Sequence, residues 1–287
     1  PWSTPSPPSS IPGRPDNKDS PVESTWKMDD SPNVAGALSW QARRQPNATA
    51  IHYPSGGAFG KEKYLECSYQ ELDELSNVYA RGLKAYGIGP GTRTALMLTP
   101  GLDFFAVFFA LFKAGAVPVL IDPGIGVKPL KACLAEAAPK AFIGVTKAHF
   151  ARKFLGWAKE SCELLVSAGP KFGLGGVTLK KIREMGEADS SEVLHDVDPN
   201  DMAAILFTSG STGAPKGVVY RHRHFNAQVE MLRNAFRIKP GEVSLPTFPP
   251  FALFDPALGM STIVPEMDPT RPAEADPNKL VQVIDEF

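Results

Sequence analysis

The stretch Thr208-Ser-Gly-Ser-Thr-Gly-Ala-Pro-Lys-Gly217 decides the fold class of this chain. Its ten residues include three glycines, four hydroxyl side chains and one lysine. Glycine lets the backbone reach left-handed conformations and lets a ligand approach the amides, and successive amides in such a loop form a concave site for anions. The hydroxyls add hydrogen-bond donors for phosphate oxygens, and Lys216 adds a mobile positive charge. The composition therefore predicts a phosphate-binding loop.

The flanking residues predict that this loop connects two strands. Residues 203–207 form a short apolar run typical of a buried strand, and residues 218–220 form a second one. A Walker A loop has Ser or Thr after its lysine and then a helix, whereas Gly217 and β-branched residues follow Lys216. We therefore expect a hairpin connection. A flexible Gly/Ser surface loop without a ligand is the alternative.

Residues 208–217 and the preceding strand resemble the signature loop of the AMP-forming adenylating enzymes. This superfamily includes acyl-CoA synthetases, firefly luciferase and the adenylation domains of peptide synthetases, and the resemblance covers residues 34–287. Two further stretches resemble its β-lactone synthetase branch, which serves long-chain olefin biosynthesis: Val218-Val-Tyr-Arg-His-Arg-His-Phe225 and Pro246-Thr-Phe-Pro-Pro-Phe-Ala-Leu-Phe-Asp-Pro-Ala-Leu-Gly-Met260. The similarity to this branch depends mainly on residues 218–272.

The resemblance implies an α/β fold class with mainly parallel sheets covered by helices, as in the N-terminal portion of the adenylate-forming fold. The apolar pattern predicts the same class, because continuous apolar strands alternate with helices along the chain. Ser68 and Glu71 form a capping-box pattern at the start of one helix. Pro118 interrupts an apolar strand and predicts an irregular or edge position. The other expected helices cover residues 102–114, 128–137, 148–159 and 222–237, and the other expected strands cover 94–98, 117–121 and 141–145.

The expected organisation is one partial domain preceded by a tail. Residues 1–33 begin with a stretch rich in proline and serine, which predicts disorder. Residues 34–287 are expected to form a partial N-terminal AMP-binding domain, with the acidic segment 186–201 as an internal connector. The family's second ATP motif, ribose-binding aspartate, hinge and C-terminal lysine domain have no counterpart in the sequence, and Pro1 stands where a start methionine would. We therefore expect a piece of a longer protein that is inactive alone.

Composition excludes several classes of function. The net charge of −1 gives no case for nucleic acid or an anionic membrane as partner. Cys67, Cys133 and Cys162 lack metal-site spacing and are odd in number, which favours reduced thiols in the cytoplasm. No run approaches the roughly 18 apolar residues of a transmembrane segment. The strongest, residues 104–112, predicts a buried helix, with a membrane-surface segment as the alternative, and the N-terminus has no secretory-signal pattern.

The resemblance assigns the phosphates of ATP to the loop. In this superfamily a carboxylate attacks the α-phosphate of Mg-ATP and gives an acyl-adenylate and pyrophosphate. The predicted cofactors are therefore ATP and Mg²⁺, with no catalytic residue and no protein metal site assigned. The residues implied to hold the β- and γ-phosphates are Thr208, Ser209, Gly210, Ser211, Thr212, Gly213, Lys216 and Gly217.

Charged and imidazole side chains after the loop have two interpretations each. His222 lies where the family often has a histidine that begins the next helix, and a cap or core hydrogen bond competes with substrate contact. Arg221, Arg223 and Arg233 are either a solvated face or a binding patch.

The segment 246–260 is implied to form the acyl site. Many acyl-CoA synthetases have Pro-x-Phe-His here, and matching Pro249-Pro-Phe251 to that pattern places Ala252 at the histidine position. The implied pocket residues are Phe248, Phe251, Ala252 and Phe254. Plain core packing of these apolar side chains is the alternative.

The function implied is ATP-dependent adenylation of a long-chain carboxylic acid. For a 2-alkyl-3-hydroxy acid, the hydroxyl would then displace AMP and close a β-lactone, since a tethered nucleophile has a high effective concentration. A long-chain fatty acid–CoA ligase and a silent nucleotide-binding scaffold are the alternatives. The implied partners are the acyl substrate and, for this branch, a complex with other olefin-biosynthesis enzymes.

Overall fold

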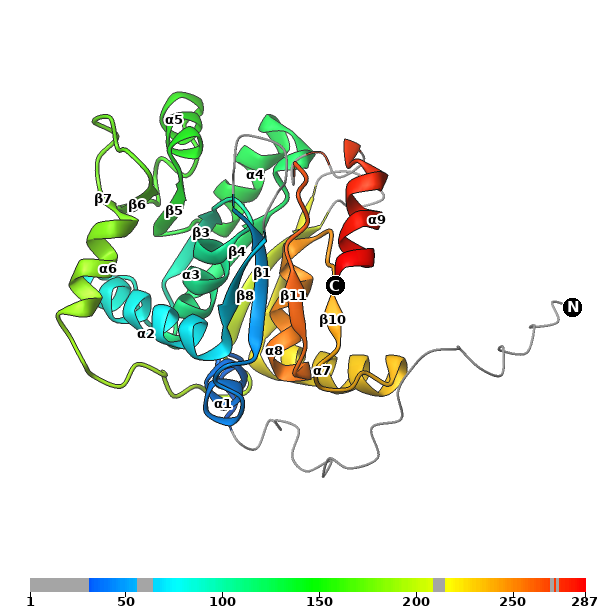
Figure 1. The fold of residues 1–287 in the computed structure, drawn as a ribbon. Coiled ribbons are helices and arrows are strands. Elements are labelled where there is room, and N and C mark those ends of the chain that lie inside the picture. The colour runs from blue at the N-terminus through cyan, green and yellow to red at the C-terminus, as the bar shows by residue number, and fades with distance from the viewer. Residues whose placement is uncertain (1–30, 56–63, 209–214, 269–270, 272–273) are drawn as a thin grey trace, which may run out of the picture.

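The computed structural model describes residues 31–55, 64–208, 215–268, 271 and 274–287, so most of the predicted tail lies outside the described residues. The main sheet has the strand order β7-β6-β5-β3-β4-β8-β9 and is parallel except for the β8–β9 pair (Figure 1). Its strands are β3 (Arg93–Met97), β4 (Val117–Ile121), β5 (Ala141–Val145), β6 (Leu164–Ala168), β7 (Val177–Thr178), β8 (Met202–Thr208) and β9 (Lys216–Arg221). The predicted α/β class with mainly parallel strands is confirmed.

Helices cover both faces of this sheet, as the continuous apolar strands predicted. Alternate residues of one strand enter different cores: Ala141 and Ile143 of β5 pack with α2 and α3, whereas Phe142 packs with α4. The helices of the described residues are α1 (Gly36–Arg44), α2 (Tyr69–Tyr86), α3 (Leu102–Lys113), α4 (Val127–Ala137), α5 (Thr146–Leu155), α6 (Leu179–Glu187), α7 (His222–Phe236), α8 (Asp255–Leu258) and α9 (Pro277–Glu286). Two 3₁₀ turns are η2 (Pro123–Ile125) and η3 (Pro249–Phe254).

Local sequence signals set several helix boundaries. The Ser68 hydroxyl accepts a hydrogen bond from the Glu71 amide at 3.2 Å, and the Glu71 carboxylate accepts one from the Ser68 amide at 2.8 Å. This confirms the capping box at the start of α2, and Gly87 ends the helix at a φ of 99°. Helix α5 ends at Leu155 instead of residue 159, because Gly156 takes a left-handed conformation there.

Pro118 corrects a prediction, because β4 lies inside the sheet between β3 and β8 and not at an edge. The Val117 amide donates to Thr92 on the β3 side. Since successive residues of a strand point to opposite neighbours, the Pro118 nitrogen faces the β8 side. Pairing with β8 begins only at Val119, so the missing N–H of proline costs no ladder hydrogen bond.

A second sheet was not predicted from the sequence. Its order is β10-β11-β1-β2, with β11 parallel to both β1 and β10 (Figure 1). The strands are β1 (Thr49–Pro54), β2 (Tyr64–Ser68), β10 (Val243–Ser244) and β11 (Ser261–Ile263). This small sheet brings the start of the described chain beside the segment that follows η3.

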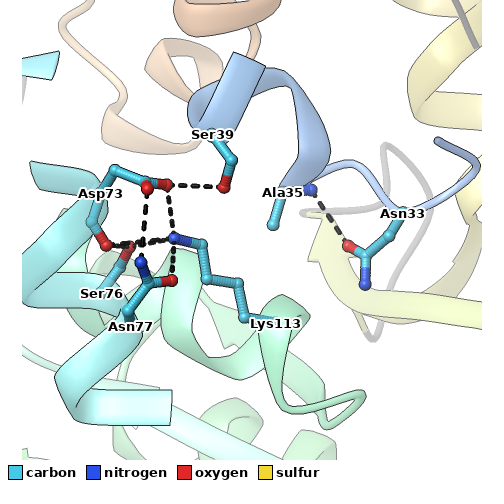
Figure 2. Close-up of polar contacts among 7 residues, drawn as sticks. All are labelled: Asn33, Ala35, Ser39, Asp73, Ser76, Asn77 and Lys113. Atoms are coloured by element: carbon cyan, nitrogen blue, oxygen red, sulfur yellow. Dashed lines mark hydrogen bonds and ion pairs between the residues drawn. The ribbon is translucent and has the colours of Figure 1, made fainter. Parts of the chain in front are cut away.

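Helix α3 confirms the predicted buried helix, and its last residue is a buried lysine. The Lys113 ammonium donates to the Asp73 carboxylate at 2.6 Å, to the Ser76 hydroxyl at 2.8 Å and to the Asn77 carbonyl oxygen at 2.7 Å (Figure 2). The Ser39 hydroxyl donates to the same carboxylate at 2.6 Å. Burial lowers the pKa of Lys113 to about 8, although Asp73 opposes the shift. The cluster ties α1, α2 and α3 together.

Candidate functional site

The predicted phosphate loop connects the antiparallel strands β8 and β9. Their register pairs Thr208 with Lys216, Phe207 with Gly217 and Leu206 with Val218. This confirms the expected hairpin and excludes a helix beginning at Lys216. Ser209, Gly210, Ser211, Thr212 and Gly213 lie outside the described residues, so their assignment to phosphate stays a prediction.

Side-chain packing explains why the second residue of β9, Gly217, is a glycine. A Cβ atom added there would lie 2.9 Å from the ring of Phe207, which is buried in the core below β8. Only glycine lets β9 lie this close to the ring. The loop's last glycine therefore has a structural role whatever the loop binds.

Lys216 carries a positive charge at the mouth of the hairpin. Its side chain is exposed, and it forms no ion pair within the described residues. A lysine held by a strand end and lacking a protein partner is suited to an anionic ligand.

A small apolar cavity of about 50 Å³ lies beside the hairpin. It is bounded by Phe108 of α3, Leu120 of β4, Leu206 of β8 and Tyr220 of β9. Helix α7 and the η3 segment contribute the rest of the wall: Phe225, Gln228, Phe248, Pro250, Phe251, Leu253 and Phe254. Leu206 is two residues before the strand end at Thr208, so the cavity starts about 7 Å along the strand from the loop.

The predicted acyl residues divide between this cavity and the core. Phe248, Phe251 and Phe254 line the cavity, whereas Ala252 is buried in the core and is not among the lining residues. Phe248 and Phe251 contact each other at 5.3 Å between ring centroids and are 40% and 63% exposed. These two rings are therefore the solvent-exposed part of the cavity wall.

Gln228 places a polar group in this apolar wall. Its side-chain Oε1 is buried and has no hydrogen-bond partner among the described residues. An unpaired buried carbonyl oxygen is destabilising unless a ligand or water donates to it. Gln228 was missed in the sequence, although its position three residues after Phe225 places both on one face of α7.

Asp255 fixes the segment that forms the cavity wall. Its Oδ2 accepts hydrogen bonds of 2.5 Å from the hydroxyls of Ser244 and Thr262, on β10 and β11. Burial raises the pKa of Asp255 to about 7, and the two hydroxyls oppose the shift. Nothing local in the sequence indicated this contact, because its partners come from two other elements.

His222 belongs to the core. Burial lowers its pKa to about 4, and its Nδ1 accepts a hydrogen bond of 3.4 Å from the Val34 amide. Its ring also contacts Phe112, with centroids 6.1 Å apart. Arg221 and Arg233 donate to the backbone carbonyls of Asn200 and Ala257, while Arg223 is exposed. These contacts favour structural roles.

The three cysteines are free, and burial raises the pKa of Cys67 to about 12 and of Cys162 to about 11. Thiols with such pKa values are poor nucleophiles at neutral pH. In the described part of the chain, no group of three or more His, Cys, Asp or Glu side chains could hold a metal ion. None of the described helices has both the length and the apolar content needed to cross a membrane.

Comparison with known proteins gives a consistent result. The family model described as AMP-binding enzyme matches residues 38–265. The chain is 54% identical over 257 residues to an olefin beta-lactone synthetase of Xanthomonas campestris pv. campestris, and 52% identical over 258 residues to one of Stenotrophomonas maltophilia. Each alignment covers 89% of this chain and 46% of the relative. The chain therefore spans about half the length of these curated relatives.

The solved structures agree on the fold. A long-chain-fatty-acid-CoA ligase from Archaeoglobus fulgidus superposes with a TM-score of 0.74 at 21% identity, covering 88% of this chain and 50% of that one. The inhibitor-bound N-terminal domain of a Mycobacterium tuberculosis protein superposes with a TM-score of 0.65 at 23% identity, covering 83% and 58%. At these identities the likeness concerns the fold alone.

Proposed function

The chain belongs to the AMP-binding enzyme family, and on that premise we propose that the complete protein adenylates a long-chain 2-alkyl-3-hydroxy acid and converts it to a β-lactone. A carboxylate oxygen of the acid attacks the α-phosphorus of Mg-ATP, and pyrophosphate leaves. The substrate's 3-hydroxyl oxygen then attacks the acyl carbonyl, loses its proton, and AMP leaves as the ring closes. The similarity to two olefin beta-lactone synthetases supports this choice of product.

One observation carries the proposal: an apolar cavity lies beside the end of a hairpin whose loop has the composition of a phosphate site. In this proposal Thr208–Gly217 holds the β- and γ-phosphates, and the Lys216 ammonium supplies the positive charge that binds them. Phe248, Phe251 and Phe254 receive the apolar end of the acid. Residues 34–287 then form part of an N-terminal AMP-binding domain.

One described residue, Lys216, fits the binding of Mg-ATP as a substrate. The Lys216 backbone is held at the strand end by its pairing with Thr208, and its exposed ammonium has no ion-pair partner among the described residues. Phosphate transfer depends on positioning and on neutralising negative charge, and a lysine in this place can supply both. Mg²⁺ enters with the nucleotide and supplies further charge neutralisation. We assign it no protein ligand.

The departure at Ala252 favours lactone formation over thioester formation. By sequence matching, Ala252 stands where many acyl-CoA synthetases have histidine. Its methyl group is buried in the core and does not line the cavity, and it cannot act on an acyl carbonyl. The substrate's own hydroxyl is tethered close to the acyl carbonyl, so ring closure needs no second substrate to bind.

Product analysis tests this function. The complete protein is incubated with Mg-ATP and a long-chain 2-alkyl-3-hydroxy acid, with and without coenzyme A, and the products are identified by mass spectrometry. We expect AMP, pyrophosphate and a β-lactone, with no dependence on coenzyme A. The same acid without its 3-hydroxyl is the matched control and should give no lactone. Formation of an acyl-CoA from simple fatty acids, with no lactone from the hydroxy acid, would favour a fatty acid–CoA ligase instead.

A further inference from the structure

Three phenylalanine rings form an exposed aromatic surface at one end of the main sheet. Phe150 and Phe154 lie one turn apart on α5 with ring centroids 6.2 Å apart, and Phe172 of the β6–β7 connection lies 6.4 Å from Phe150. Phe154 and Phe172 are 77% and 71% exposed. Figure 1 shows α5 and this connection at the end of the molecule away from α9. Contiguous exposed apolar side chains of this size mark interaction sites.

The backbone of the connection holds Phe172 outward. Phe172 has a φ of 41°, in the left-handed region that side chains other than glycine avoid. Residues held in that region tend to occur at functional sites, where the surrounding structure enforces them. Three nearby glycines with positive φ shape the same turn: Gly173, Gly175 and Gly176.

The charged side chains of α5 and of the β6–β7 connection, the two segments that carry the three rings, are all basic. Lys147 and Lys153 on α5 are exposed and form no ion pair within the described residues, and Lys171 precedes Phe172. Residues 137–159 include five basic and no acidic side chains, and residues 164–183 again have no acidic one. The net charge of −1 for the whole chain conceals this local excess of basic residues.

We propose that this surface, the α5 patch (Lys147, Phe150, Lys153, Phe154, Lys171 and Phe172), docks the protein on an anionic lipid bilayer. Phenylalanine rings enter the boundary between headgroups and acyl chains, and lysines bind the negative headgroups. An acidic protein could also bind the lysines, but the exposed rings of Phe154 and Phe172 suit the apolar interior of a bilayer. A bilayer needs no complementary shape. The inference does not depend on the proposed reaction.

Vesicle binding tests the proposal with the complete protein. We expect co-sedimentation with phosphatidylglycerol-rich vesicles, at least tenfold weaker binding to phosphatidylcholine vesicles, and a marked loss at high salt, because salt screens exposed charges. Lys147→Glu should weaken binding by more than the roughly fivefold expected for loss of one lysine near an anionic surface.

Aromatic variants separate docking from simple charge attraction. The double variant Phe154→Ser with Phe172→Ser should lose most of the binding, while Phe236→Ser should not, although Phe236 is equally exposed at 72% on α7. Circular dichroism and thermal unfolding check that the variants are folded. Absence of binding by the wild-type protein, or unchanged binding by the double variant, overturns the proposal. A dimer that dissociates in the double variant, without lipid binding, would assign the patch to self-association instead.

Discussion

Thr208 and Lys216 face each other across β8 and β9 as the last described pair before the loop. Because neighbouring strands lie about 5 Å apart, this pair fixes the distance between the two ends of the loop. The sheet therefore sets the position of the Lys216 backbone, and the loop composition does not.

Lys216→Ala in the complete protein should lower the adenylation rate roughly 10- to 150-fold, because one charge-assisted phosphate contact contributes about 1.5–3 kcal/mol. Adenosine binding should remain nearly normal, since the loop holds only the outer phosphates. Pyrophosphate release and nucleotide binding are measured separately. Lys239→Ala, an exposed lysine outside the hairpin, is the control. An unchanged rate in Lys216→Ala would remove the lysine from the mechanism.

Gln228→Leu should raise the free energy of unfolding by about 1 kcal/mol, because it removes a buried carbonyl oxygen without a described partner. Gln228 also lines the cavity, so we expect its oxygen to accept a hydrogen bond from the 3-hydroxyl of a substrate that enters there. The variant should therefore lose preference for a 3-hydroxy acid over its deoxy analogue, measured as the ratio of the two kcat/KM values. A destabilised variant with an unchanged ratio would show that Gln228 serves the fold and not the substrate.

Asp73→Ala should lower the free energy of unfolding by about 3–5 kcal/mol, because it leaves the buried Lys113 ammonium without its charged partner. Adding Lys113→Met should recover much of the loss, since a buried methionine needs no partner. Urea unfolding at neutral pH measures both. Arg183→Ala breaks the exposed Arg183–Glu187 pair and should cost less than about 1 kcal/mol. Equal losses at the two pairs would contradict the prediction.

The low pKa of His222 predicts acid sensitivity. The folded pKa is about 4 and the ordinary value is 6.5, so between these pH values the unfolded state binds the proton and the folded state does not. The stabilisation is complete above pH 6.5 and is lost as the pH falls through 4, by about 3 kcal/mol in all.

The comparison with His222→Gln isolates this effect. Asp255 acts in the opposite direction, because its raised pKa of about 7 makes its contribution complete below pH 3.8 and lost as the pH rises through 7. Asp255 is present in both proteins, so its effect cancels in the difference. The free energy of unfolding of wild type minus that of the variant should fall between pH 6.5 and 4. A constant difference would mean that His222 titrates normally.

Features encoded by neighbouring residues were predictable from the sequence. The capping box at Ser68, the apolar helix α3 and the hairpin around the Gly/Ser run each depend on residues close in the chain. The position of Pro118 was not predictable, because it depends on where pairing with β8 begins, more than 80 residues later. The small sheet was missed because its short strands come from separate segments.

The sequence likewise predicted only those residues of the candidate site that lie close together in the chain. Phe248, Phe251 and Phe254 come from one segment, so their shared apolar character was visible in the sequence. Gln228 and Phe108 join them only when α7 and α3 pack beside that segment. The wall of a cavity built from five or more elements depends on tertiary packing, which a linear pattern does not encode.

The parallel pairing of β1 with β11 has a consequence for biosynthesis. Ile51 faces Thr262, more than 200 residues later in the chain. At roughly 5–20 residues per second, a ribosome needs about 10–40 seconds to make that interval. During this time β1 of the nascent chain has β2 on one side and an open edge on the other, and open strand edges invite aggregation. The second sheet is therefore completed only after β11 has been synthesised, and a chain that stalls before β11 keeps this strand edge open.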